Sequence, residues 1–132
     1  MVAIAFHVER PIDPQAVRAL YDANNWWPNR RLDDIAAVLS TGLVIGAWEG
    51  DRLVGFARAV TDGRLRAYIE DMAVHPDHRH AGIASALLER LLAALGDIET
   101  VSLFCEPELV DLYGRLGFKA RRSQVVMHRA RP

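Results

Sequence analysis

Residues 68–84 read Tyr-Ile-Glu-Asp-Met-Ala-Val-His-Pro-Asp-His-Arg-His-Ala-Gly-Ile-Ala. This pattern predicts a strand, then a short polar loop, then a helix whose first turn holds only small residues. A helix start offers free backbone N–H groups and the positive end of the helix dipole, so it suits a phosphate group. Gly82 and Ala84 let a ligand approach the backbone, and Arg79 adds a positive charge. The stretch therefore predicts either a phosphate-binding loop or, as its simpler interpretation, a plain strand-to-helix connection.

The rest of the chain divides into strands and helices on both sides of this stretch. Strands are expected at residues 2–8, 43–48, 53–60, 65–74 and 101–104, with a final strand or hairpin at 118–128. Helices are expected after the cap Asp13-Pro14, at residues 32–39, from Ile83 to the stop at Gly96, and at 107–116. Three hairpin-linked strands followed by two crossover helices predict an α/β fold, with a central mixed sheet and helices on both faces.

Composition narrows the class of protein. The chain has 132 residues, of which 51% are hydrophobic and 25% charged, and we expect one domain over residues 1–132. A formal net charge of −1 gives no electrostatic reason to expect a nucleic-acid or membrane partner. The chain contains no apolar run near the roughly 20 residues of a membrane span and no recognisable secretion signal at its start. With one cysteine, Cys105, expected to be a small buried residue, the expected location is the cytoplasm.

Several segments together resemble the GNAT superfamily of N-acetyltransferases. Residues 79–84, Arg-His-Ala-Gly-Ile-Ala, resemble its Gln/Arg-x-x-Gly-x-Gly/Ala signature. The preceding Met-Ala-Val-His-Pro, the leucine-striped helix after the loop and the Tyr-x-x-x-Gly-Phe pattern of residues 113–118 are also similar to that family. The resemblance implies the GNAT fold over nearly the whole chain. It also implies transfer of an acetyl group from acetyl-CoA to a primary amine of a small molecule or peptide.

The resemblance also implies where acetyl-CoA binds. Amides of the loop would hold the pyrophosphate, and the preceding strand would pair with the pantetheine arm where it splays from the strand at 101–104. In this sequence, His80 stands where glycine is common in the family, and Ala84 replaces the last glycine. The implied cofactor-binding residues are Met72, Ala73, Val74, Arg79, His80, Ala81, Gly82, Ile83, Ala84 and Ser85.

Acetyl transfer to an amine needs a base for the amine and a proton for the departing thiolate. The resemblance assigns Tyr113 to the position that faces the CoA sulfur, whereas on its own it also fits a tyrosine that merely packs a helix. Glu70 is the preferred base and Asp71 the second, by similarity to polyamine acetyltransferases. A regular strand would point these two to opposite faces, so a bulge is needed to bring both to one site. The alternative is that both carboxylates only pair with nearby arginines, Arg58 or Arg66.

The acceptor site is expected between the first two helices, again by resemblance. Its candidate residues are Trp26, Trp27, Asn29, Arg30 and Arg31. Tryptophan rings bind cations on their faces or apolar groups by contact, and one of the two is expected to be a core residue instead. The two arginines favour an acceptor that carries a carboxylate, such as an amino acid.

The sequence supports three further expectations, on metal binding, on competing functions and on association. The histidine-rich loop at residues 75–80 is too compact to place three ligands around one ion, so no metal is expected. A non-catalytic acyl-CoA-binding module and a protein acetyltransferase acting on lysines or N-termini are the competing functions. The predicted edge strand Gln124–His128, apolar and poor in charge, suggests a homodimer.

Overall fold

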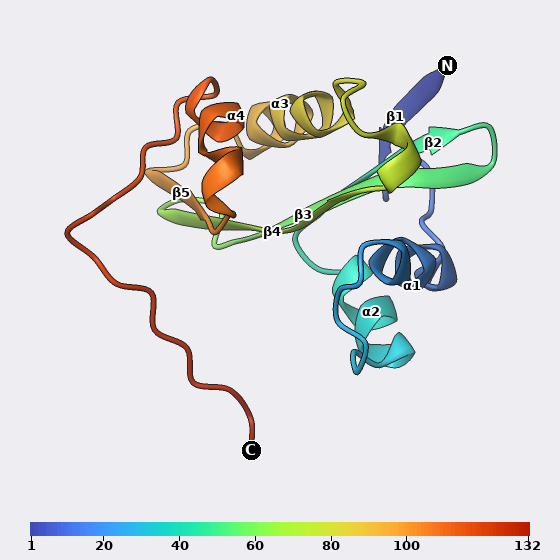
Figure 1. Cartoon of the computed structure of the whole chain (residues 1–132), viewed down its shortest axis with the longest axis horizontal. Coiled ribbons are helices and arrows are strands. Elements are labelled where there is room, and N and C mark those ends of the chain that lie inside the picture. Colours follow the sequence, from blue (N-terminus) through green and yellow to red (C-terminus); the bar gives the residue numbers. More distant parts are fainter.

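The computed structural model describes residues 1–132, in which one five-stranded sheet separates two groups of helices (Figure 1). The strands are β1 (Val2–Phe6), β2 (Leu43–Glu49), β3 (Arg52–Thr61), β4 (Arg66–Val74) and β5 (Thr100–Leu103). The helices are α1 (Pro14–Ala23), α2 (Leu32–Leu39), α3 (Ile83–Leu95) and α4 (Val110–Gly114), with short 3₁₀ turns η1 (Pro76–His78) and η2 (Pro107–Leu109). No helix combines the length and apolar character needed to cross a bilayer.

The sheet is mixed, as predicted. The strand order is β1-β2-β3-β4-β5, and every neighbouring pair is antiparallel except β4 and β5, which run parallel. Short turns link β2 to β3 and β3 to β4, whereas α1 and α2 lie between β1 and β2. The parallel pair β4 and β5 needs the crossover that α3 supplies. In Figure 1 the sheet is seen nearly edge-on, with α3 and α4 above it and α1 and α2 below. The expected fold class, with helices on both faces, is confirmed.

Alternation along β2 shows how one strand serves both layers. Val44 and Trp48 belong to the core on the α1 and α2 side, and Ile45 and Ala47 to the core on the α3 side. Successive side chains of a strand point to opposite faces, so a doubly covered strand is apolar at nearly every position. The α3 side is filled mainly by the leucine stripe of α3, namely Ile83, Leu87, Leu88 and Leu91.

The helix boundaries follow local capping chemistry. The Asp13 side chain accepts a hydrogen bond from the Gln15 amide at 2.9 Å, and Pro14 opens α1. Gly96, with φ 68°, ends α3 in a conformation that suits glycine. The predicted helix at 107–116 is shorter than expected, because its first turn is the 3₁₀ turn η2 and regular α-helix covers Val110–Gly114 only.

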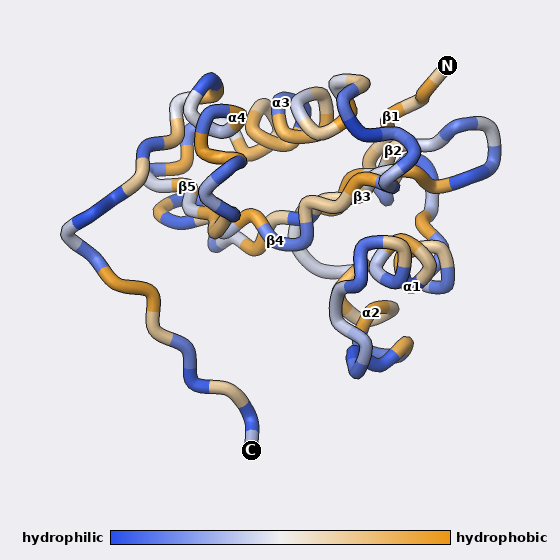
Figure 2. Tube along the Cα trace, in the orientation of Figure 1, coloured by the Kyte–Doolittle hydropathy of each residue, from blue (hydrophilic) through white to orange (hydrophobic).

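The predicted final strand or hairpin at residues 118–128 is wrong. Residues 119–132 form no helix or strand; they leave α4, pass the β5 end of the sheet and extend toward the α2 side (Figure 1). This tail carries an apolar stretch between hydrophilic flanks (Figure 2), and Val125 and Met127 are 85% and 89% exposed. Strand propensity is realised only when a neighbouring strand supplies hydrogen bonds, and here no strand pairs with the tail. The edge strand proposed for dimerisation is therefore absent.

Candidate active site

The pairing of β4 is irregular on both sides at the same point. Its parallel pairing with β5 ends at Ile69 opposite Leu103, although β4 itself continues to Val74. On its other side the register with β3 shifts between Phe56 and Arg58. Asp71 has φ 59° in this β-bulge, a left-handed conformation that is uncommon for residues other than glycine. The splayed strand leaves backbone N–H and C=O groups of residues 70–74 facing β5 without a strand partner, as the resemblance predicted.

The bulge also changes where the two adjacent carboxylates point. Glu70 is the register partner of Arg58, and the Asp71 carboxylate also contacts Arg58, at 3.2 Å. Both acidic side chains therefore lie on the α1 side of the sheet, whereas Ile69 and Met72 pack on the α3 side. In a regular strand two consecutive residues would face opposite ways, so the bulge is what brings the carboxylates to one site.

Asp71 is the only polar or charged residue among those that are fully buried, with 7% of its surface exposed. Its Oδ2 accepts hydrogen bonds from the Tyr21 hydroxyl at 2.9 Å, Arg30 Nη1 at 2.9 Å and Arg58 Nε at 3.2 Å. Its Oδ1 accepts one from Trp27 Nε1 at 3.1 Å. Two cations and two neutral donors thus satisfy this carboxylate, which is how a buried charge is tolerated.

Glu70 is the less satisfied of the two carboxylates. Both arginine ion pairs at this position go to Asp71, and no cation pairs with Glu70. Burial raises the pKa of the Glu70 carboxyl, and the adjacent charge of Asp71 raises it further. A carboxylate that is partly buried, unpaired and beside a second negative charge is a better proton acceptor than an exposed one. Burial and the Glu70 charge also raise the pKa of Tyr68 to about 12.

Tyr113 lies on the other face of the sheet, in the core that also includes Ile69 of β4 and Leu103 of β5. Its ring is buried in the α3-side core, and its edge meets Phe118 with ring centroids 6.0 Å apart. Its hydroxyl forms no hydrogen bond within the chain, yet it is absent from the fully enclosed polar atoms without a partner, so it reaches the surface. Burial raises the pKa of Tyr113, with a smaller contribution from Cys105, so the phenol keeps its proton at neutral pH. Tyr113 and Glu70 therefore lie on opposite faces of the sheet.

The loop before α3 presents backbone amides to the outside. Gly82 caps α3 with φ 80°, and no side chain caps the helix. The first intrahelical bond recorded at this end runs from the Ala86 amide to the Gly82 carbonyl, so the amides before it have no helical partner. His80 also adopts a left-handed conformation, with φ 64°. The side chain of Arg79 reaches Asn24 in the loop after α1. This geometry fits the pyrophosphate of acetyl-CoA: an uncapped helix start with space above its glycine.

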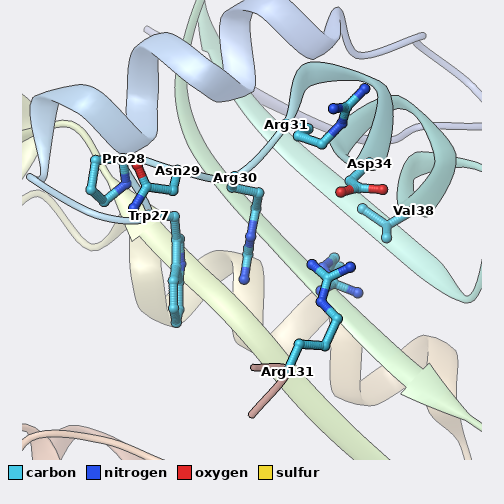
Figure 3. Close-up of a pocket in the computed structure, with 9 residues that line it drawn as sticks. Trp27, Pro28, Asn29, Arg30, Arg31, Asp34, Val38 and Arg131 are labelled. Atoms are coloured by element: carbon cyan, nitrogen blue, oxygen red, sulfur yellow. The ribbon is translucent and has the colours of Figure 1, made fainter.

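A pocket of about 500 Å³ opens beside the carboxylates on the α1 and α2 side (Figure 3). Figure 3 shows the Trp27 ring and the Arg30 side chain side by side at its wall, and the Arg30 guanidinium lies 4.2 Å from the Trp27 ring centroid. The lining residues are Trp27, Pro28, Asn29, Arg30, Arg31, Asp34, Val38, Arg58 and Arg131. Four arginines and one carboxylate line it, so the pocket favours an anionic group.

The structure brings together most but not all of the predicted acceptor residues. Trp27, Asn29, Arg30 and Arg31 line the pocket, whereas Trp26 does not. The expectation that either Trp26 or Trp27 is a core residue is wrong: they are 37% and 45% exposed, and the buried tryptophan is Trp48. Trp27 is held by polar contacts, to Asp71 and Arg18, rather than by the core.

Other site residues were missed at the sequence level or placed wrongly. Tyr21 was not among the predicted site residues, but its hydroxyl donates a hydrogen bond to Asp71, 50 residues away in the chain. Arg131, in the tail, lines the pocket without any sequence signal that could have placed it there. Cys105 is exposed, contrary to expectation, because β5 ends at Leu103 and the chain leaves the sheet. Partial desolvation of the sulfur by its neighbours raises the pKa of the thiol, and the charges of Glu106 and Glu108 raise it further, so the structure offers no activated nucleophile there.

Comparison with known proteins agrees with this architecture. The model of the acetyltransferase (GNAT) family matches residues 6–118. Histone acetyltransferase TAP1 of Glycine max is 32% identical over 131 residues, covering 89% of this chain and 56% of that protein. The chloroplastic GCN5-related N-acetyltransferase 2 of Arabidopsis thaliana is 32% identical over 140 residues, covering 89% of this chain and 54% of its own length. The chain thus spans about half the length of these curated relatives.

Among solved structures, a Xanthomonas campestris protein assigned to the GNAT family superposes with a TM-score of 0.84. It is 27% identical, and the match covers 100% of this chain and 94% of that one. The family match, the relatives and the shared fold lead to one conclusion: the chain belongs to the GNAT family of acetyltransferases.

Proposed function

We propose that this chain transfers the acetyl group of acetyl-CoA directly to a primary amine. The observation that carries the proposal is the opening between β4 and β5 beyond Ile69, with Glu70 on one face of the sheet and Tyr113 in the core on the other. Acetyl-CoA supplies an acyl group activated as a thioester. An opening with a base on one side and an acid on the other suits a transfer in which the amine and the thioester arrive from opposite faces.

The residues divide the chemistry between them. Glu70 takes a proton from the amine, whose nitrogen then forms the new C–N bond, while the Met72 amide donates a hydrogen bond to the acyl oxygen. As the C–S bond breaks, Tyr113 gives its proton to the departing sulfur. The amides from His80 to Ser85 bind the pyrophosphate, and the backbone of residues 72–74 pairs with the pantetheine arm.

We propose further that the acceptor carries a negative group as well as the amine, such as the carboxylate of an amino acid. The four arginines of the pocket support this, with Arg131 free of any ion pair and Arg31 paired only at the surface. Arg30 and Arg58 are largely neutralised by Asp71, so the net attraction is moderate.

A protein or peptide amine is the second candidate acceptor. The relative named Histone acetyltransferase TAP1 gives the specific reason to keep it, as does the exposure of Trp26 and Trp27 in the α1–α2 loop. A third, non-catalytic role as an acyl-CoA-binding module does not need the two proton-transfer groups.

One assay separates these functions. Release of the CoA thiol is measured with acetyl-CoA and a panel of free amino acids, polyamines and lysine-containing peptides, alongside the thermal shift with acetyl-CoA alone. We expect stabilisation by acetyl-CoA and thiol release with amino acids in excess of polyamines. Preference for peptides would favour the second candidate. Stabilisation without release for every amine would favour the binding module.

We also propose that two chains associate, although not through a C-terminal edge strand. The support is the exposure of the apolar tail residues Val125, Val126 and Met127 beside the unpaired edge of β5. Sedimentation of the wild type and of Val125→Glu tests this, and a wild-type monomer at all concentrations would end the proposal. The expected cytoplasmic location stays a prediction from composition.

A further inference from the structure

The Asp71 carboxylate lies where four segments of the chain meet. It accepts hydrogen bonds from Tyr21 in α1, from Trp27 and Arg30 in the α1–α2 loop and from Arg58 in β3, while its own backbone belongs to β4. These contacts join residues that are 13 to 50 positions apart in sequence. No other buried side chain in the structure gathers so many polar partners from separate elements.

The contact with Trp27 holds a strained backbone. Trp27 has φ 53°, a conformation that a bulky residue keeps only where its surroundings impose it. Three contacts do so: its indole N–H donates to Asp71, Arg30 covers its ring at 4.2 Å, and its carbonyl accepts from Arg18 at 3.0 Å. Asp71 itself has φ 59°, so both ends of the indole–carboxylate bond are backbone outliers. Such strain is typical of functional sites.

Three of the residues bound to Asp71 also form the pocket. Trp27, Arg30 and Arg58 line it, and each donates a hydrogen bond to this one buried carboxylate. Figure 3 shows Trp27 and Arg30 side by side in the pocket wall. The residue immediately before Asp71 is Glu70, which faces the same side. The pocket wall and the proposed base are thus anchored at adjacent positions of one strand.

We propose that Asp71 is a positioning residue that holds the acceptor pocket in line with Glu70, and that it is not itself the base. This inference rests on the proposed function. Asp71 already accepts four hydrogen bonds and pairs with two cations, so its oxygens are not free to receive a proton from the amine. Asp71 acts by holding the side chains of Trp27 and Arg30 in line with the adjacent Glu70.

The test is Asp71→Asn, which keeps the size of the side chain and removes its charge. We expect kcat/KM for the amine to fall on the order of 100-fold, as for a displaced substrate, with the KM for acetyl-CoA unchanged. The acid limb of the kcat profile should also move to lower pH. The groups around Glu70 are Tyr68, Asp71, Arg30 and Arg58, and removing the Asp71 charge leaves both arginines to lower the pKa of Glu70.

Single-donor variants keep the test valid if Asp71→Asn does not fold. Trp27→Phe removes the indole N–H and keeps an aromatic wall, and Tyr21→Phe removes only the hydroxyl. Each should raise the KM for the amine, and Trp27→Phe should add little once Asp71 is already Asn. Asp51→Asn is the matched control, because Asp51 is exposed in the β2–β3 turn and forms no ion pair.

The indole N–H resonances of the three tryptophans give a readout that does not depend on turnover. The Trp27 signal, assigned from Trp27→Phe, should shift in Asp71→Asn and stay in place in Asp51→Asn. If the wild type transfers no acetyl group, the proposed function fails, and the Trp27 signal during amine titration still decides whether Asp71 organises the pocket. The role of Asp71 would be overturned if the Trp27 signal did not move in Asp71→Asn. It would also be overturned if Asp71→Asn lost stability while its KM for the amine and the acid limb of its kcat profile stayed those of the wild type.

Discussion

The candidate binding sites on the two faces of the sheet are built from different parts of the chain. On the α3 side the candidate cofactor site consists of backbone: an uncapped helix start at Gly82 and the free edge of β4. On the α1 side the acceptor pocket consists of side chains, with Arg30, Arg58 and Trp27 held by Asp71. One site is shaped by where the chain turns and the other by which side chains meet.

This difference has a consequence for how each site can change. Backbone amides survive most substitutions, so we expect the candidate cofactor site to tolerate His80 and Ala84 in place of glycine. The side-chain site depends on partners up to 50 residues apart, so one substitution at Asp71 disturbs it as a whole. A backbone site suits an acyl donor that stays the same, and a side-chain site suits an acceptor that varies.

The largest expected effect on turnover is that of substituting Tyr113, in the core on the α3 side. Tyr113→Phe keeps the ring that packs on Phe118 and removes the hydroxyl, which forms no bond within the chain. We expect kcat to fall about 100- to 10,000-fold, the usual range for general acid catalysis, with the melting temperature and acetyl-CoA affinity nearly unchanged. Steady-state kinetics and thermal unfolding of this one variant measure both. Turnover within about threefold of the wild type, with chemistry rate-limiting, would remove the catalytic role.

The next effect sharpens the backbone side of the comparison with a matched pair of glycines. Gly82 and Gly63 have φ 80° and 81°, and a Cβ at either position meets no atom within 4 Å. A glutamate therefore brings similar strain, bulk and charge to both positions. Only Gly82→Glu should abolish stabilisation by acetyl-CoA, which at about 100 times Kd amounts to about 2.7 kcal/mol in the wild type. Equal losses of the thermal shift in both variants would show that the loop before α3 has no special part in binding.

A smaller, pH-dependent effect distinguishes the two carboxylates. Glu70 acts as a base only when ionised, and burial together with Asp71 raises its pKa above the usual 4.5. As the pH falls, kcat should therefore begin to drop at a higher pH than for an ordinary glutamate, and activity should recover fully above the raised pKa. Glu70→Gln should lower kcat and flatten this limb in a pH series at saturating amine. A limb that persists unchanged in Glu70→Gln would assign it to another group.

The smallest effect concerns the charge of the acceptor pocket. Arg31 pairs with Asp33 at 2.8 Å, and both side chains are largely exposed. The Asp33 charge therefore partly neutralises the attraction of Arg31 for an anion. Arg31→Gln should raise the KM of a carboxylate-bearing amine by no more than about fivefold, the scale of an exposed ion pair. Asp33→Asn should lower that KM, because it frees the guanidinium. The KM of both variants is measured with an amino acid and with its amide. A change in KM that is the same for both substrates would contradict an anionic acceptor.

Local sequence determined the elements that depend on near neighbours. The caps at Asp13 and Gly96, the leucine stripe of α3 and the loop at residues 79–84 follow from contacts within a few residues, so their positions could be predicted. The mixed sheet followed from the order of these elements. The final strand could not be predicted reliably, because a strand exists only where a partner supplies its hydrogen bonds.

Tertiary structure alone decided the roles within the acceptor pocket. The sequence pointed to Glu70, Asp71 and the loop around Trp27, but alternation along a strand predicts opposite faces for neighbouring carboxylates. The bulge at Asp71 reverses that outcome, and it arises from how β4 meets β3 and β5 rather than from any local signal. Which carboxylate is paired and which is left free depends on arginines that folding brings from distant positions. Backbone turns are encoded by nearby residues, whereas the charge state of a buried group is set by everything that packs around it.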